Sequence, residues 1–185
     1  GEIAFTLDPG DIQFTDFSGE EAIYLPGAAC PFETGEPGLP GIGYSLVIPQ
    51  GTMLHDVQVE VVSQVEIPGV HRVAPVLAIP LSEQIPVVIP HSDSYLGGAF
   101  PQTRIHALHT GNKTGFRIGS FSFVPFTWDP STGRLSVITE AVLTPVTAPD
   151  TDAPALALTD NQIAVASRAL ESMVANPEMI QACAP

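Results

Sequence analysis

The sequence predicts a mainly β protein, an antiparallel β-sandwich with one C-terminal helix. Turn signals built from its 19 prolines and 16 glycines recur about every 8–12 residues, the spacing typical of sandwiches and barrels. The stretches between these turns alternate apolar and polar residues, as half-buried strands do. With 44% hydrophobic residues in 185, the chain is long enough to bury a substantial core.

Four short strands are predicted in the first quarter of the chain. Residues 3–7 (IAFTL) form an apolar run that stops at the turn DPG. Residues 12–17 (IQFTDF) alternate strictly, so we expect one buried and one exposed face. Residues 22–25 form a short run before a Pro-Gly turn, and residues 44–48 form a strand that follows the turn-rich stretch GEPGLPG.

The longest predicted strand covers residues 55–67. Val57, Val59 and Val61 lie on one face, and Val62 then breaks the alternation. A slip of one residue inside a strand is what a β-bulge produces, so we expect a bulge at this point. Residues 74–90 contain four prolines, which cannot serve a central ladder, and are expected to form an extended loop or an edge segment.

The segment TWDPSTGRL is the sharpest local signal. It places Asp129 at the start of a turn, proline next, and Gly133 where a positive φ is needed. We therefore expect a type I turn with a glycine bulge that joins residues 116–128 and 134–147 in one long hairpin. Trp128 is expected to pack over the end of this hairpin; a sugar-binding face would also use such a ring.

Composition divides the chain into a β-sandwich at 1–146, a Pro/Ala/Thr-rich linker at 147–158, and a helix with its tail at 159–185. Thr159 and Gln162 form a capping box, which predicts an amphipathic helix from about residue 160 to 175. The linker and helix could lead to a further, catalytic domain. Alternatively, the helix folds back over the sandwich, because its apolar side chains need burial, namely Leu170, Met173 and Val174.

Charge excludes several classes of partner. The chain has 6 Lys and Arg against 20 Asp and Glu, a net charge of −14, which repels nucleic acid and anionic lipid. No apolar run has the roughly 20 residues that a transmembrane helix needs, so we expect no membrane insertion. Low lysine content and two cysteines are compatible with an exported protein, and Cys30 and Cys183 are either bonded to each other or free.

No residues form a recognisable catalytic set, so we expect a non-enzymatic fragment without metal or cofactor. His106 and His109 are three apart on a predicted strand, where their side chains would point to opposite faces. The remaining histidines have no Asp, Glu or Cys at metal-ligand spacing and are expected to be solvated, namely His55, His71 and His91. Neither cysteine has a neighbouring base or helix N-terminus that would favour its thiolate.

Several motifs in order resemble the N-terminal propeptide domain of gingipain-type cysteine peptidases. They are GEPGLP before a strand, VQVEVVS, AP, QIP, SYLGGAFPQ and finally PFTWDPSTGRL, with weaker similarity in the first two strands. The similarity covers about residues 3–146. It implies a secreted β-sandwich that precedes a caspase-like peptidase domain in the same chain, helps it to fold and/or keeps it latent by laying a loop across its cleft.

The resemblance also places the peptidase-contacting loop. It matches the residues between the motifs AP and QIP, which are Val76, Leu77, Ala78, Ile79, Pro80, Leu81, Ser82 and Glu83. Gingipain propeptides offer a basic residue here, whereas this loop has none and looks shorter. The peptidase would then have a specificity other than Arg or Lys, or the domain would serve folding or display. The alternative is a cell-surface module that binds carbohydrate or protein.

Overall fold

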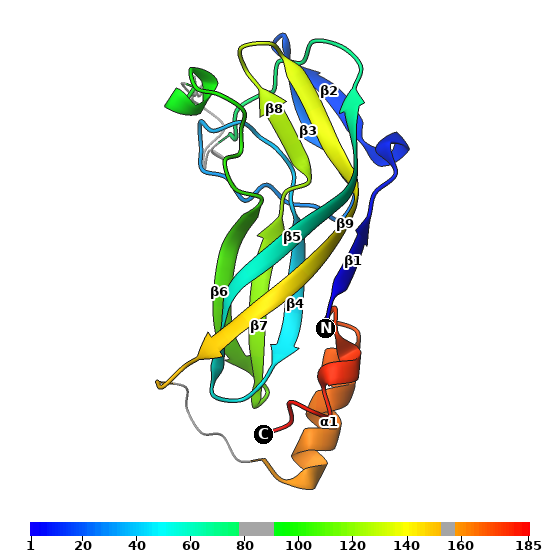
Figure 1. Cartoon of the computed structure of the whole chain (residues 1–185), viewed down its shortest axis with the longest axis vertical. Coiled ribbons are helices and arrows are strands. Elements are labelled where there is room, and N and C mark those ends of the chain that lie inside the picture. Colours follow the sequence, from blue (N-terminus) through cyan, green and yellow to red (C-terminus); the bar gives the residue numbers. More distant parts are fainter. Residues whose placement is uncertain (78–90, 153–157) are drawn as a thin grey trace, which may run out of the picture.

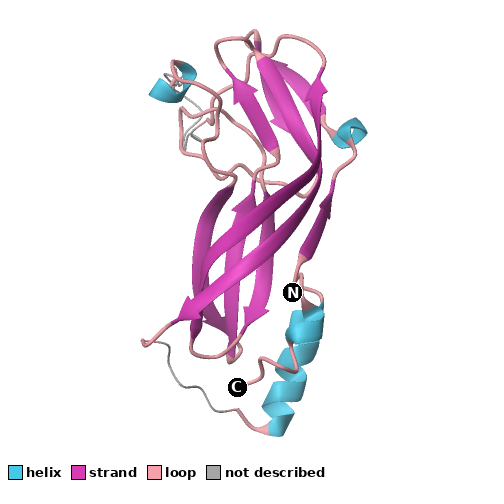
Figure 2. Cartoon of the chain, in the orientation of Figure 1, coloured by secondary structure: helices cyan, strands magenta, loops and turns pink. Residues whose placement is uncertain are grey.

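The computed structural model describes residues 1–77, 91–152 and 158–185. These residues form nine strands and one α-helix (Figures 1 and 2). The strands are β1 (Ile3–Thr6), β2 (Gln13–Phe17), β3 (Glu20–Tyr24), β4 (Ile42–Ile48), β5 (Thr52–Ile67), β6 (Ile105–Lys113), β7 (Phe116–Phe123), β8 (Phe126–Asp129) and β9 (Arg134–Pro149). The helix α1 spans Asp160–Glu171, and single 3₁₀ turns occur at Pro9–Asp11, Asp93–Tyr95 and Pro177–Met179.

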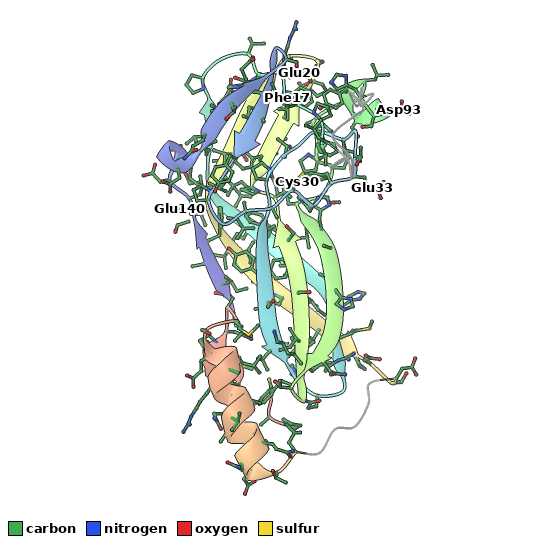
Figure 3. All side chains as sticks on the ribbon, turned by 180° about the vertical axis from the view of Figure 1, so that it is seen from behind. Phe17, Glu20, Cys30, Glu33, Asp93 and Glu140 are labelled. Carbon is green, nitrogen blue, oxygen red and sulfur yellow. The ribbon has the colours of Figure 1, made fainter. Side chains whose placement is uncertain are left out.

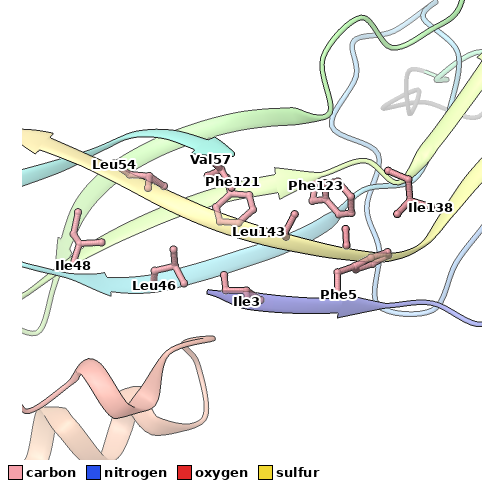
Figure 4. Packing of buried hydrophobic residues seen from close by; sticks show 11 residues of the cluster. Ile3, Phe5, Leu46, Ile48, Leu54, Val57, Phe121, Phe123, Ile138 and Leu143 are labelled. Atoms are coloured by element: carbon pink, nitrogen blue, oxygen red, sulfur yellow. The ribbon is translucent and has the colours of Figure 1, made fainter. Parts of the chain in front are cut away.

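Two antiparallel sheets pack face to face, and the predicted mainly β fold is confirmed. One sheet has the order β1-β9-β5, with β8 also paired to β9, and the other has the order β4-β7-β6. Apolar side chains from both sheets meet between them, as Figure 4 shows for Leu46, Phe121, Phe123, Ile138 and Leu143. Phe5 and Phe123 pack edge to face there, with ring centroids 4.9 Å apart. This cluster forms the lower core of the molecule.

A second core lies at the other end, where β8 and the upper half of β9 extend beyond the sandwich (Figure 1). Trp128 is only 3% exposed in it, and its indole N–H donates to the carbonyl of His71 at 3.0 Å. The expected packing role of Trp128 is therefore confirmed, and its ring is not available to stack on a sugar. The hairpin of β2 and β3 lies beside this core.

The expected buried face of residues 12–17 is wrong. Every residue of β2 is exposed, because this strand pairs only with β3 among the described strands instead of joining a larger sheet. Ile12, just before the strand, is the residue that reaches the core. By contrast, the bulge in β5 is confirmed, since the register with β9 shifts between Val61 and Ser63.

The prediction of one long hairpin is correct for its turn and wrong for its first strand. The turn is as predicted, because Gly133 has φ +69° and its N–H donates to the Asp129 carbonyl at 2.8 Å. However, only β8 pairs with β9, whereas β7 pairs with β4 and β6 in the opposite sheet. The chain changes sheets at Val124 and Pro125, where proline cannot donate to a ladder.

The C-terminal helix folds back onto the outer face of β4 and β7. The capping box of Thr159 and Gln162 is present, and the helix ends at Glu171, a turn earlier than expected. Leu170 and Val174 are buried against Val47 and Phe116, whereas Met173, expected to need burial, is 47% exposed. The strand β9 continues to residue 149, so the first three residues of the expected linker pair with β5.

Asn176 fastens the tail after the helix to the sheet. Its side-chain amide donates to the carbonyl of Val47 at 2.8 Å, and its side-chain oxygen accepts from the N–H of Val47 at 2.9 Å. A side chain thus takes the place of a neighbouring strand at this point of the β4 edge. The helix and tail therefore belong to the folded domain.

Candidate functional site

Two residues of the expected peptidase-contacting loop, Val76 and Leu77, lie within the described structure. Val76 is half-buried and Leu77 is exposed. The other expected members lie outside the described residues, namely Ala78, Ile79, Pro80, Leu81, Ser82 and Glu83. The described part of the site consists of the chain that leads into this segment, up to Leu77, and the chain that leaves it, from His91 onward.

Both flanks of the segment are held by the same short piece of chain. The N–H of Gly35 donates to the carbonyl of Val76 at 3.0 Å, and the N–H of Val76 donates to the carbonyl of Glu36 at 2.8 Å. On the far side, the N–H of Ser92 donates to the carbonyl of Gly35 at 2.9 Å. We call these three main-chain bonds the Gly35 clamp. Val76 and Ser92, which flank the segment, are thereby both hydrogen-bonded to Gly35.

Glycine is needed at the centre of this clamp because Gly35 has φ +91°, which side chains with a Cβ rarely adopt. The neighbouring main chain continues the contact, since the N–H of Gly38 donates to the carbonyl of Ala74 at 2.9 Å and Pro37 bridges to Pro75. The sequence alone predicted that GEPGLPG is a turn-rich stretch that leads into a strand. It missed the clamp, because backbone bonds across 40 residues leave no local pattern.

The strand β3 supports the chain just before the segment. Glu21 bridges to Val73 in parallel, with main-chain bonds to Arg72 and Ala74 of 2.6 and 2.9 Å. The Glu21 carboxylate also lies 2.8 Å from Nδ1 of His71. The expectation that His71 is solvated is wrong, because it is 7% exposed and packs against the ring of Phe14.

Aromatic and acidic side chains hold the chain that leaves the segment. His91 contacts the Glu20 carboxylate at 2.8 Å and packs on the ring of Tyr95, with centroids 4.1 Å apart. The Tyr95 hydroxyl donates to the carbonyl of Val73 at 2.8 Å. Burial and the charge of Glu20 raise the pKa of Tyr95, so this hydroxyl stays protonated and keeps donating.

The histidines on β6 are arranged differently from the expectation. A register shift lies between His106 and His109, which pair with Ser122 and Ser120. Those two serines are two residues apart and share a face, so the two histidines also lie on one face rather than on opposite faces. Among residues 1–77, 91–152 and 158–185, no three His, Cys, Asp or Glu side chains are grouped to hold a metal ion.

The two cysteines are not bonded to each other: both are free, Cys30 exposed and Cys183 buried. Although Cys30 as a residue is exposed, partial burial of its thiol raises the pKa; the charge of Glu36 adds to this effect, and a backbone hydrogen bond from Phe32 opposes it. Burial also raises the pKa of Cys183. Neither environment favours the thiolate that a nucleophile needs. No helix in the described parts is long and apolar enough to span a membrane.

No protein-family model and no curated protein matches the chain. Two solved structures are similar in fold. A chain of the complex of Porphyromonas gingivalis RgpB pro- and mature domains superposes with a TM-score of 0.69 at 22% identity, over 95% of this chain and 92% of that chain. A structure described as an insight into the zymogenic latency of gingipain K, also from Porphyromonas gingivalis, gives 0.53 at 17% identity, over 79% and 99%. The resemblance to a gingipain-type propeptide domain is therefore confirmed for the fold.

Proposed function

We propose that this chain is the non-catalytic propeptide-like domain of a secreted gingipain-type cysteine peptidase. It docks on the peptidase domain of the same precursor, helps that domain to fold and/or keeps it latent. The observation that supports this most directly is the Gly35 clamp, which presents the segment beginning at Val76 on a fold that the two gingipain structures share. The thiol environments of Cys30 and Cys183 support a role without chemistry of its own.

The docking element in this proposal is the run from Val76 to Glu83. Its two flanks are already joined at Gly35, so part of the entropy of ordering a long loop is lost when the domain folds. The sequence has no Lys or Arg between Val73 and Thr103. A segment lying in a peptidase cleft would therefore offer apolar side chains, and we infer a peptidase whose main pocket does not require a basic residue.

The proposal is tested by adding this domain to the peptidase domain of its own precursor and measuring the hydrolysis of fluorogenic peptides. We expect saturable inhibition, a higher refolding yield of the peptidase, or both. Replacing residues 78–83 by a Gly/Ser segment of equal length should abolish the inhibition, whereas Val165→Ser on the exposed side of α1 should not. A wild-type domain that neither slows nor helps to refold the peptidase would refute the proposal.

The second candidate function is a cell-surface module that binds carbohydrate or protein. Trp128 is buried and cannot contact a sugar. Phe17 and Tyr24, however, lie on the same face of the β2–β3 hairpin and are exposed, with 54% of Tyr24 accessible to solvent. Exposed aromatic rings are the usual platforms for sugars. Saturable binding on a glycan array that is lost in Tyr24→Ala would favour this function, and an array without hits would count against it.

A further inference from the structure

A hollow of about 510 Å³ lies next to the Gly35 clamp. We call it the Phe32 hollow. Residues 31–33 and 36 line it from one stretch of chain, residues 97–103 line it from another, and His106 of β6 also contributes. Glu36 belongs to both features, because its side chain lines the hollow and its carbonyl accepts the N–H of Val76. The hollow therefore lies beside the start of the segment at Val76.

The apolar part of the hollow is held in place by aromatic packing. The ring of Phe32 lies 4.7 Å from the ring of Phe100 and 4.7 Å from that of His106, measured between centroids. His106 is itself fixed, since its Nε2 donates to the carbonyl of Thr103 at 2.8 Å. The hollow is thus a shaped recess with an aromatic wall.

Two residues that line the hollow are negatively charged, Glu33 and Glu36. The main-chain N–H of Glu33 donates to the Glu36 carboxylate at 3.0 Å, which holds the Glu36 side chain beside residue 33. The four ion pairs found among the described residues use other carboxylates, and no Lys or Arg lines the hollow. Figure 3 shows Glu33 and Asp93 on the same side of the molecule.

We propose that the Phe32 hollow receives a positively charged side chain, Arg or Lys, from the surface of the peptidase domain, which rests on the proposed function. A cation gains from two carboxylates and from the face of an aromatic ring at once. A neutral group would have to strip water from the carboxylates without compensation, and an anion would be repelled. The net charge of −14 also favours a positively charged partner over a negatively charged one.

The hollow itself is tested with a small probe, in a titration of the ¹⁵N-labelled domain by NMR. Nα-acetyl-arginine amide should shift the amide signals of residues 31–36 and 97–103 at millimolar concentrations, and the uncharged citrulline analogue should not. The shifts should disappear in Glu33→Gln/Glu36→Gln. Equal shifts with both probes, or shifts spread over the whole surface, would overturn the proposal.

The partner is tested by measuring the Kd of the domain for its own peptidase domain at several salt concentrations. We expect Glu33→Gln/Glu36→Gln to raise Kd about tenfold and to weaken its dependence on salt. The matched control is Glu60→Gln/Glu140→Gln, which removes the same charge from exposed residues, with Glu140 on the opposite side of the molecule from Glu33 (Figure 3). This control should change Kd less than twofold.

The two failures are distinguishable. A hollow variant that binds the peptidase domain with the wild-type Kd and salt dependence overturns the inference and leaves the proposed function standing. A wild-type domain that does not bind the peptidase domain refutes the proposed function, and the role of the hollow as the peptidase contact falls with it. Each variant should give the wild-type circular dichroism spectrum, as a folded domain would.

Discussion

Leu170→Ala should destabilise the whole domain, because α1 is part of its core. The side chain of Leu170 is 1% exposed and packs with Val47 and Phe116 on the outer face of the β4–β7 sheet. Replacing a buried leucine by alanine costs about 2–5 kcal/mol, and the lower half of this range applies where neighbours can close in. The helix lies at the edge of the domain, so we expect a loss of about 3 kcal/mol. For a domain of this size that lowers Tm by about 6–12 °C.

The assay is urea unfolding followed by far-UV circular dichroism, with Val165→Ala as the matched control. Val165 is on the same helix but 62% exposed, so its truncation should change the free energy of unfolding by less than about 0.5 kcal/mol. Both variants should keep the wild-type m value. If Leu170→Ala were as stable as Val165→Ala, the helix would not be docked on the sheet, and the reasoning that places it in the domain would be refuted.

Three further predictions concern the tail, the β8–β9 turn and the thiols. Asn176→Ala should lower the free energy of unfolding in urea by about 2 kcal/mol, since it removes two hydrogen bonds to the backbone of β4; a wild-type value would contradict this. Hydrogen bonds from Ser131 lower the pKa of Asp129 below its ordinary value, so this carboxylate stabilises the fold at neutral pH and the contribution is lost as the pH falls through the lowered pKa. Asp129→Asn should therefore lower Tm at pH 7 more than at pH 2, and equal differences at both would refute the assignment. Ellman's reagent should label Cys30 slowly in the native protein, because its pKa is raised, and Cys183 only after unfolding; rapid native labelling of Cys183 would show that the tail is undocked.

Structural features that depend only on residues close together in the sequence were predicted correctly. The β8–β9 turn needs an Asp, a Pro and a Gly at fixed offsets, and Gly133 has the positive φ that this pattern requires. The bulge in β5 follows from one break in alternation, and the capping box of α1 from the pair Thr159 and Gln162. In each case the residues that determine the geometry are neighbours, so their chemistry is visible without the fold.

Features that depend on distant pairing were missed. The buried positions are Phe121 and Phe123 in β7 but Phe126 and Trp128 in β8, so the alternation slips by one residue, and only the choice of partner strands shows that this slip is a change of sheet at Pro125. The strand β2 alternates like a half-buried strand, yet no second sheet covers it among the described residues. The burial of His71 depends on Glu21 and Phe14, which come from a hairpin 50 residues earlier in the sequence. The Phe32 hollow likewise needs two loops that only the fold brings together.

In the proposed function, the Gly35 clamp is the feature that distinguishes the docking segment from an ordinary loop. Closing the 15 residues between Val76 and Ser92 costs a free chain about 2.4 kcal/mol, by the logarithmic dependence of loop entropy on length. Here that cost is met when the domain folds, because both flanks bond to Gly35 in a structure that β3, Tyr95 and Pro37 also support. A partner that binds the segment gains this difference, about 60-fold in affinity over the same residues as a linear peptide. Under the proposed function, the domain therefore contributes to binding even through residues that the partner never touches, because the clamp joins both flanks of the segment before docking.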